Sequence, residues 1–308
     1  MRHLPVMLAE TLEQLAIKKN GIYIDCTFGR GGHSRGILKQ LENSGQLLAL
    51  DRDSEAIESE PAKVLLQDPR FRLRHCRFSK LASVIEAEGL AGKVDGVLFD
   101  LGVSSPQLDQ SERGFSFLRD GPLDMRMDRQ ADFSAQQWLA QVEESELVRI
   151  LFDYGEERFA RRIARAIIES RKSKPIATTR QLAELVETAM PYRDRHKHSA
   201  TRTFQAIRIA VNSELDELKE ALTQSLGVLK IGGRLVVISF HSLEDRIVKR
   251  FIRDESGFKQ DAGRLPLKQS QLPRGSLRKI GKAIRAGNQE TAINPRARSA
   301  IMRVAERV

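Results

Sequence analysis

A strand, a glycine-rich turn and a helix follow one another near the start of the chain, and this order constrains the fold most. Residues 22–24 are β-branched or aromatic and lie between Gly21 and Asp25, a pattern typical of a short buried strand. Glycines follow at 29, 31 and 32, and apolar residues then recur at helical spacing over 37–41. The order predicts the start of a nucleotide-binding α/β unit.

Glycine allows a sharp backbone turn and a close approach by a ligand, because no Cβ stands in the way. We expect the amides of Gly31, Gly32 and His33 to face an anionic group at the start of the helix. Glycine turns also follow strands in α/β proteins that bind no ligand there. The turn alone therefore does not establish a binding site.

A second predicted strand, residues 46–50, ends at Asp51, about 20 residues beyond the glycines. A carboxylate at that place can accept hydrogen bonds from both ribose hydroxyls of a nucleotide. Enzymes that use nicotinamide cofactors and enzymes that use S-adenosylmethionine share this arrangement. A phosphate-binding Walker loop is disfavoured, because no Gly-Lys-Ser/Thr sequence closes the turn.

Two further strands are predicted over 71–75 and 94–100, and each is followed by a side chain suited to a ligand. Phe78 follows the first, where it could stack on an adenine or belong to the core. Asp100 ends the second, just as Asp25 and Asp51 end earlier strands. Ligands of open α/β sheets bind beyond the carboxyl ends of the strands, so we expect the site at this edge.

The alternation of strands and helices stops after the fourth strand. Residues 133–190 have only helical patterns, and residues 111–129 have the composition of a long ordered loop. The sheet resumes after residue 200. We therefore predict a first sheet part at 1–105, an all-helical insertion at 106–199 that recognises RNA, and a second sheet part at 200–308.

The second sheet part is predicted to start with one long helix over residues 200–226, ended by the Gly232-Gly233 pair. A buried strand over 234–240 follows, then a helix whose capping box is formed by Ser242 and Asp245. Residues 264–285 are predicted to be a basic loop, and residues 297–305 a last strand.

Charge points to a polyanionic partner. The net charge is +10, which fits nucleic-acid binding or simply solubility. Four arginines on one face of a predicted helix carry a single sign, which favours phosphate contact over plain solvation only slightly. They are Arg158, Arg161, Arg162 and Arg165.

Cysteine usage and hydropathy indicate the compartment. Cys26 and Cys76 are the only cysteines and form no Cys-x-x-Cys pair, so neither a disulfide framework nor a metal site is predicted. The sequence has no apolar run of membrane-spanning length and no signal-peptide core, so we expect a cytoplasmic protein that does not bind membranes.

Several longer motifs resemble one family, the bacterial small-subunit rRNA cytosine-N4 methyltransferases, called MraW or RsmH. The resemblance spans nearly the whole chain in the family's order. The motifs that carry it are Tyr23–Ser34, Asp100–Gln107, Gly121–Met127, Thr203–Gln205 with Val211–Leu215, Ser239–Arg246 and Asn294–Ser299.

This resemblance implies a Rossmann-like S-adenosylmethionine-dependent methyltransferase sheet with an inserted all-helical domain. It also implies methylation of the exocyclic N4 of a cytidine in the decoding region of 16S rRNA, position 1402 in standard rRNA numbering. The expected partner is 16S rRNA or the small ribosomal subunit, and not DNA. The implied cofactor-binding residues are Gly31, Gly32, His33, Asp51, Phe78, Asp100 and Gln107.

The group that accepts the N4 proton is left open. DNA amino-methyltransferases carry a short Pro-Pro-aromatic motif after the fourth strand, which this chain lacks. Asp100 and Ser104 are the catalytic candidates by location. Asp124 and His241 are alternatives whose structural roles, loop anchoring and helix capping, are at least as plausible.

Three other functions compete with this interpretation. A DNA amino-methyltransferase would share the cofactor site and would differ in its substrate. A nicotinamide-dependent dehydrogenase would need a proton-relay residue that we cannot place. A non-enzymatic rRNA-binding assembly factor would retain the fold without its activity.

Overall fold

The chain divides into two compact units, which are described separately. The computed structural model describes residues 5–191, 198–257 and 275–308. The sheet unit comprises Met1–Gly102 and Leu215–Val308, and the helical unit comprises Val103–Glu214. None of the helices in the described part of the chain is long and apolar enough to cross a membrane.

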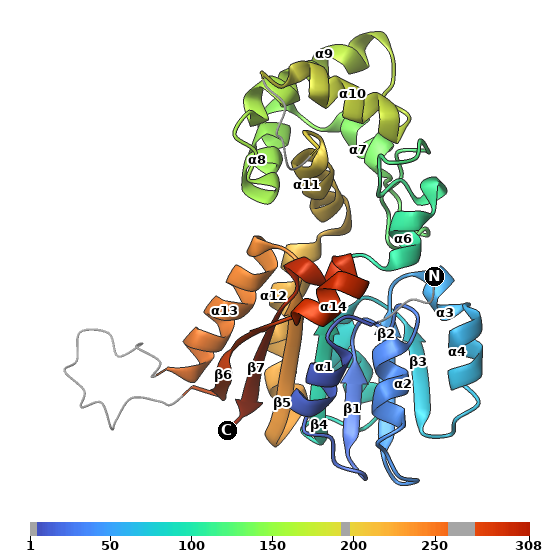
Figure 1. The fold of residues 1–308 in the computed structure, drawn as a ribbon, viewed down its shortest axis with the longest axis vertical. Helices are drawn as coiled ribbons and strands as arrows, with labels where there is room; N and C mark the ends of the chain where they lie inside the picture. Colours follow the sequence, from blue (N-terminus) through green and yellow to red (C-terminus); the bar gives the residue numbers. More distant parts are fainter. Residues whose placement is uncertain (1–4, 192–197, 258–274) are drawn as a thin grey trace, which may run out of the picture. The chain divides into compact units, whose positions relative to one another are not determined.

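The sheet unit contains a seven-stranded sheet in the order β3-β2-β1-β4-β5-β7-β6 (Figure 1). The first five of these strands are parallel, β7 is antiparallel to β5, and β6 is antiparallel to β7. The predicted Rossmann-like α/β class is confirmed. The strands are β1 (Ile22–Asp25), β2 (Gln46–Asp51), β3 (Phe71–His75), β4 (Val94–Asp100), β5 (Leu229–Ser239), β6 (Leu277–Arg285) and β7 (Ile301–Arg307).

Helices cover both faces of this sheet, because side chains alternate between the faces along each strand. Tyr23, Leu47 and Leu98 belong to one buried cluster, and their neighbours Ile24, Leu48 and Phe99 belong to the other. The first face packs against α1 (Leu8–Gln14), α2 (Gly32–Leu38), α3 (Ser54–Ile57) and α4 (Glu60–Leu65). The second packs against α5 (Leu81–Ala87), α12 (Glu214–Val228) and α13 (Ser242–Ser256). Short turns η1 (Phe78–Lys80) and η4 (Pro295–Ser299) and helix α14 (Asn288–Ile293) complete the unit.

The order of the strands fixes where a ligand can bind. β1 lies between β2 and β4, so successive strands are added on opposite sides of β1. Such a switch point leaves a crevice beyond the carboxyl ends of the two central strands. Asp25 and Asp100 are the last residues of these strands.

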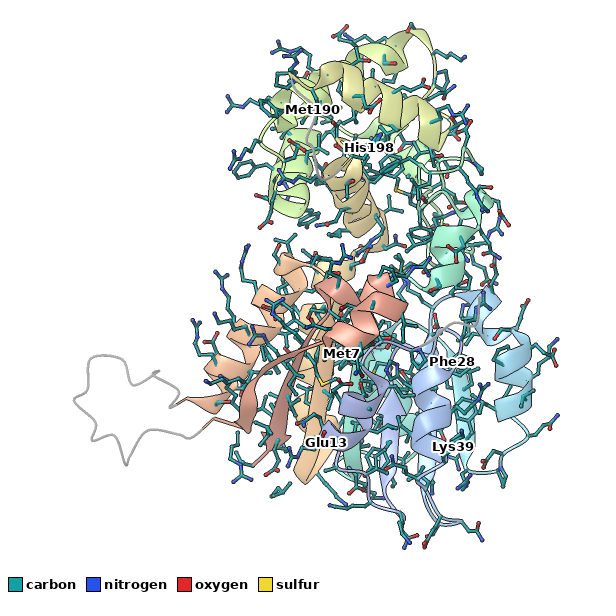
Figure 2. The ribbon with its side chains drawn as sticks, viewed as in Figure 1. Met7, Glu13, Phe28, Lys39, Met190 and His198 are labelled. Atoms are coloured by element: carbon teal, nitrogen blue, oxygen red, sulfur yellow. The ribbon has the colours of Figure 1, made fainter. Side chains whose placement is uncertain are left out.

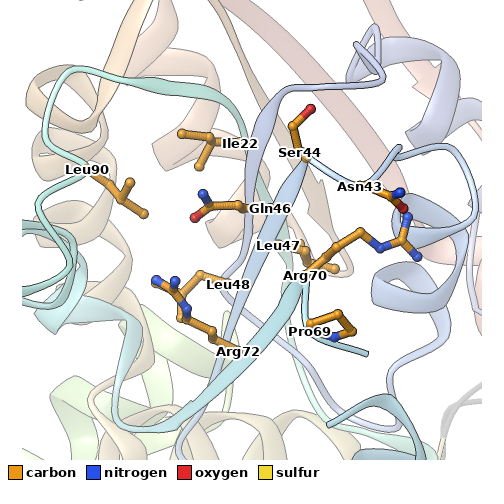
Figure 3. A pocket seen from close by; sticks show the side chains of 11 residues that line it. Ile22, Asn43, Ser44, Gln46, Leu47, Leu48, Pro69, Arg70, Arg72 and Leu90 are labelled. Carbon is orange, nitrogen blue, oxygen red and sulfur yellow. The ribbon is translucent and has the colours of Figure 1, made fainter. Parts of the chain in front are cut away.

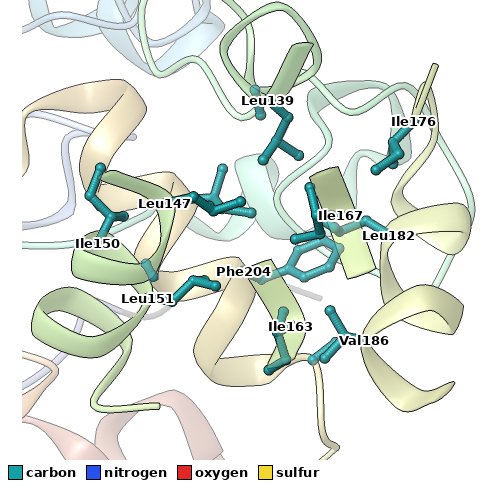
Figure 4. Packing of buried hydrophobic residues seen from close by; sticks show 14 of the residues in the cluster. Leu139, Leu147, Ile150, Leu151, Ile163, Ile167, Ile176, Leu182, Val186 and Phe204 are labelled. Carbon is teal, nitrogen blue, oxygen red and sulfur yellow. The ribbon is translucent and has the colours of Figure 1, made fainter. Parts of the chain in front are cut away.

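The helical unit has its own apolar core (Figure 4). Leu147 and Leu151 of α8, Ile163 and Ile167 of α9, and Phe204 of α11 are all buried in it. The helices are α6 (Ser105–Asp109), α7 (Ala135–Gln141), α8 (Glu144–Gly155), α9 (Ala160–Ser173), α10 (Thr179–Ala189) and α11 (Thr201–Asn212), and η2 (Ser111–Arg113) follows α6.

The predicted loop after residue 111 is ordered by two buried polar side chains. Arg113 is 1% exposed, and its Nη2 donates to the carbonyls of Arg126 and Met127 at 3.1 and 3.0 Å. Asn212 Oδ1 accepts from Met127 N at 2.8 Å, and its Nδ2 donates to Met125 O at 2.7 Å. These bonds replace the backbone pairing that a loop lacks.

The predicted long helix over 200–226 is wrong, because α11 and α12 are separated at Ser213. Ser213 has a φ of +51°, in the left-handed region that ends a helix. The predicted end at Gly232-Gly233 is also wrong, since both glycines lie inside β5. They form an irregularity in the register, where Val94 pairs with Leu229 and Gly96 with Arg234.

Three details near the end of the chain also differ. Residues 277–285 form the edge strand β6, and residues 264–274 of the predicted basic loop lie outside the described residues. The last strand covers 301–307, because Pro295–Ser299 form a short turn. Helix α13 is capped by His241 and Glu244 rather than Ser242 and Asp245, and Asp245 binds Arg303 at 2.6 and 2.9 Å.

Candidate functional site

Asp51, at the end of β2, holds the glycine turn directly. Its Oδ2 accepts from Gly29 N at 2.7 Å, and its Oδ1 accepts from Asp53 N at 2.8 Å. Burial raises the pKa of Asp51 to about 6, although these two hydrogen bonds oppose the shift. Each carboxylate oxygen has a further lone pair, so Asp51 can still accept hydrogen bonds from ribose hydroxyls.

The glycine turn is shaped by its own packing. Gly31 has a φ of +70°, and a Cβ there would lie 2.7 Å from Leu65 and 2.8 Å from Phe28. Phe28 is labelled in Figure 2. A Cβ on Gly32 would lie 2.9 Å from Pro5. The Gly31 amide donates to Phe28 O at 2.7 Å, so the prediction that this amide faces a ligand is wrong. The bond closes the turn that α2 needs in order to begin.

His33 is buried in the first turn of α2, and both ring nitrogens have polar neighbours. Nε2 lies 3.0 Å from Val6 O, and Nδ1 lies 3.5 Å from Asp100 Oδ2. A carbonyl oxygen can only accept, so we assign a proton to Nε2. Nδ1 therefore faces the carboxylate of Asp100.

Asp100 combines three features of a proton acceptor. Its Oδ1 is buried and has no hydrogen-bond partner among the residues that the structure describes. About a quarter of its side chain is exposed (24%), but Oδ1 itself is covered. Burial raises its pKa to about 6, where the positive charge of His33 opposes the shift and the negative charges of Asp25 and Glu244 add to it. A group with these properties can take a proton near neutral pH.

Asp25 is a structural residue of this edge. It is fully buried, and it accepts from Ser34 Oγ at 2.7 Å and from Thr27 N at 3.1 Å. Burial raises the pKa of Asp25, and these hydrogen bonds oppose the shift. Asp25 thereby ties the end of β1 to α2, and Thr27 Oγ1 in turn accepts from Asp100 N at 2.7 Å. The sequence showed its position but gave no sign of these contacts.

Phe78 lies after β3 and is half-buried. Its ring contacts Phe99 edge-on, with centroids 5.7 Å apart and an interplanar angle of 89°. The ring therefore takes part in the core and still has exposed surface, so both predicted roles are compatible with its position.

Ser104 and Gln107 belong to the helical unit, where they cap α6. Gln107 Oε1 accepts from Ser104 N at 2.9 Å, and Gln107 is buried. The Ser-x-x-Gln spacing is that of a capping box, a signal that could have been found in the sequence. The sheet unit thus brings together the glycine turn, Asp51 and Asp100. Ser104 and Gln107 are instead positioned by α6 of the helical unit.

The two alternative acceptors have structural partners. Asp124 forms a two-point ion pair with Arg126 at 2.7 and 2.9 Å. Burial would raise the pKa of Asp124, but the bonds and charge of Arg126 outweigh it and lower that pKa. His241 Nδ1 accepts from Glu244 N at 3.4 Å and caps α13. Both therefore have the structural roles that were considered for them.

A cavity of about 180 Å³ lies at the opposite edge of the sheet (Figure 3). Ile22 and Gln46, the first residues of β1 and β2, line it together with Arg70 and Arg72. This is the amino edge of the strands, where the switch-point rule predicts no ligand. We therefore place the candidate site at the carboxyl edge.

Known proteins resemble this chain over its full length. The family model described as the MraW methylase family matches residues 1–308. "Ribosomal RNA small subunit methyltransferase H" of Methylococcus capsulatus is 58% identical, with 98% of this chain and 99% of the relative covered. The proteins of the same name from Thioalkalivibrio sulfidiphilus and Pseudoalteromonas atlantica are 56% and 53% identical, each covering 99% of this chain and 97% and 98% of the relative. The chain therefore belongs to the MraW methylase family.

Proposed function

We propose that this protein transfers a methyl group from S-adenosylmethionine to the exocyclic N4 of a cytidine in 16S rRNA, position 1402 in standard numbering. The names of the relatives support rRNA of the small subunit as the substrate. The observation that carries the chemistry is the buried, unpartnered Oδ1 of Asp100 at the carboxyl edge of the described sheet.

The residues of this edge suit the cofactor. Asp51 would hold the ribose hydroxyls, Phe78 would contact the adenine, and the amides of Gly32 and His33 would face the carboxylate end. Gly31 would act by shaping the turn. When bound, S-adenosylmethionine supplies a methyl group already activated on a sulfonium.

Asp100 would assist the attack of the cytosine N4 amine by accepting one of its protons. The N4 lone pair of cytosine is delocalised into the ring, so the amine attacks poorly. An acceptor for one N4 proton localises the lone pair and disperses the positive charge of the transition state. Asp100 would accept this proton after a side-chain rotation that exposes Oδ1, which makes no other hydrogen bond among the described residues. Ser104 is the second candidate, since it follows the same strand in sequence.

Helical segment 106–199 is proposed to recognise the RNA around the target base. Arg158, Arg161, Arg162 and Arg165 are all exposed, and the structure gives them no ion-pair partner among the described residues. Arg161, Arg162 and Arg165 lie in the first half of α9, whereas Arg158 precedes this helix and is not part of the predicted helical face. Exposed arginines without ion-pair partners suit phosphate contacts. The target base must leave its stack to reach a methyl donor, and flanking phosphate contacts would hold the RNA meanwhile.

The test is a methyl-transfer assay with small-subunit rRNA or particles lacking the modification, using tritiated donor and nucleoside mass spectrometry. We expect N4-methylcytidine with wild-type protein and about 10²–10⁴-fold slower formation with Asp100→Asn. Ser104→Ala should retain most of the activity if Asp100 is the acceptor. Equal transfer to a DNA fragment would favour a DNA amino-methyltransferase, and no transfer to any nucleic acid would favour a binding factor.

A further inference from the structure

Helix α12 contacts two segments of the candidate cofactor site through polar side chains. Its apolar side, which includes Leu218, packs against one face of the sheet. Glu217 and Gln224 lie seven residues apart, close to two full turns, so both project from the same side of the helix. Glu217 reaches the residues next to Asp51 and Phe78, and Gln224 reaches the turn that carries Phe78. All of these residues belong to the sheet unit.

Glu217 is a buried carboxylate that joins the ends of two strands. Its Oε1 lies 3.3 Å from Arg52 Nη1 and 3.3 Å from Arg77 Nη1. Arg52 directly follows Asp51 at the end of β2, and Arg77 directly precedes Phe78 after β3. One carboxylate therefore ties together the two chain segments that carry the proposed ribose and adenine contacts.

Burial of the charges makes this contact strict. The side chain of Arg52 is 9% exposed and that of Glu217 is 7% exposed, whereas 44% of the Arg77 side chain is exposed. A buried charge is costly unless an opposite charge accompanies it, so Glu217 and Arg52 must stay together. The carbonyl of Arg52 lies 3.0 Å from His75 Nε2. The residue that follows Asp51 is thus fixed through both its side chain and its backbone.

Gln224 fixes the turn of Phe78 from the same side of α12. Its Nε2 donates to Ser79 O at 2.7 Å, and its Oε1 accepts from Ala82 N at 2.8 Å. Ser79 belongs to η1, and Ala82 lies in the first turn of α5, where amides have no partner within the helix. The ring of Phe78 contacts Phe99 of β4. The turn is therefore held by α12 on its backbone and by the sheet on its ring.

We infer that α12 positions the adenosine end of the cofactor site, with Glu217 as the main positioning residue. Through the two arginines, Glu217 sets the spacing between Asp51 and the ring of Phe78, while Gln224 holds the turn itself. The inference rests on the proposed use of S-adenosylmethionine. Ribose and adenine are joined rigidly, so both contacts form at full strength only if their spacing is fixed before binding. Loss of this spacing weakens every ligand that carries adenosine and leaves the transfer step unchanged once the site is filled.

The experiment measures the affinities of S-adenosylmethionine and 5′-methylthioadenosine by calorimetry, together with kcat and the cofactor KM on small-subunit rRNA. Glu217→Gln keeps the size of the side chain and removes its charge, so it should weaken both ligands about 10-fold. Gln224→Leu should weaken both about 5-fold. The cofactor KM should rise by the same factors, with kcat at saturating cofactor within about 2-fold of wild type. The matched control is Asp216→Asn, which changes an exposed carboxylate of α12 paired with Lys219 and should leave both affinities unchanged.

Arg77→Met, alone and combined with Glu217→Gln, completes a double-mutant cycle. The single change should weaken both ligands about 5-fold, and the double variant should bind little worse than Glu217→Gln, because both changes break one contact. Additive losses, wild-type affinity in Glu217→Gln, or weaker binding of S-adenosylmethionine alone would overturn the inference. Arg77→Met and Gln224→Leu change less buried side chains, so they keep the test decisive if Glu217→Gln fails to fold. Wild-type protein that binds both ligands and forms no N4-methylcytidine would refute the proposed reaction and leave these affinity comparisons unaffected.

Discussion

His33 Nδ1 lies 3.5 Å from Asp100 Oδ2, and this pair joins the first turn of α2 to the end of β4. The opposite nitrogen of the ring is held by Val6 O, so the imidazole cannot rotate without losing a hydrogen bond in a buried place. The other oxygen of Asp100, Oδ1, is covered and has no hydrogen-bond partner among the described residues. Several expectations depend on this arrangement.

Methyl transfer should rise with pH as Asp100 ionises. Its pKa is raised to about 6, so the rate should increase between about pH 5 and 7 and then level off. At saturating cofactor, Asp100→Asn should lower kcat by about 10²–10⁴-fold and remove this dependence. Rate–pH profiles with saturating cofactor measure both effects, and an unchanged profile in the variant would exclude Asp100 as the acceptor.

His33→Gln should shift the same profile to higher pH. The positive charge of His33 lowers the pKa of Asp100, so its removal leaves the raising effects of burial, Asp25 and Glu244 unopposed. His75→Gln is the matched control, because His75 Nε2 also lies 3.0 Å from a carbonyl, that of Arg52. A shift in both variants, or in neither, would mean that His33 does not act through Asp100.

Asp100→Asn should stabilise the fold at high pH. The pKa of Asp100 is higher in the folded protein than in the unfolded chain, so unfolding releases a proton between about pH 4 and 6. The wild type therefore loses stability as pH rises through this window. The variant should gain about 1–3 kcal/mol at pH 8 and much less at pH 4, as measured by urea unfolding. A gain independent of pH would contradict the assigned shift.

Asp51→Ala should weaken S-adenosylmethionine binding. It removes the proposed ribose contact and also the acceptor that fixes Gly29 N, so we expect a loss of about 1–3 kcal/mol by calorimetry. Asp53→Ser is the control, since Asp53 caps α3 by accepting from Glu55 N and serine can do the same. Unchanged affinity in Asp51→Ala would remove this residue from the cofactor site.

Local patterns predicted the strands well, because the alternation of apolar and polar residues and the polar residues at strand ends can both be recognised within a short segment. β3 and β4 have the predicted limits, and Asp51 and Asp100 lie at the predicted edge. The break at Ser213 could not be predicted, since the apolar period continues from α11 into α12. The sequence predicts a loop where β6 lies, because β6 is an exposed edge strand rich in charge, in which only Leu277 is buried.

Side-chain partnerships were the harder part of the site. Nothing in the sequence shows that the Gly31 amide binds Phe28 O, or that Asp25 binds Ser34, because both depend on how the turn folds back. The cap formed by Ser104 and Gln107 did have a signal in its spacing. The cap of α13 has a related pattern, but histidine is a less usual first residue than serine.

The most direct test of the proposed chemistry is nucleoside mass spectrometry of 16S rRNA after single-turnover incubation with wild type and Asp100→Asn. We predict stoichiometric N4-methylcytidine at one position with the wild type, and about 10²–10⁴-fold slower formation with Asp100→Asn at saturating S-adenosylmethionine. Wild-type yields from Asp100→Asn, or methylation of another atom or base by the wild type, would contradict the proposed role of this carboxylate.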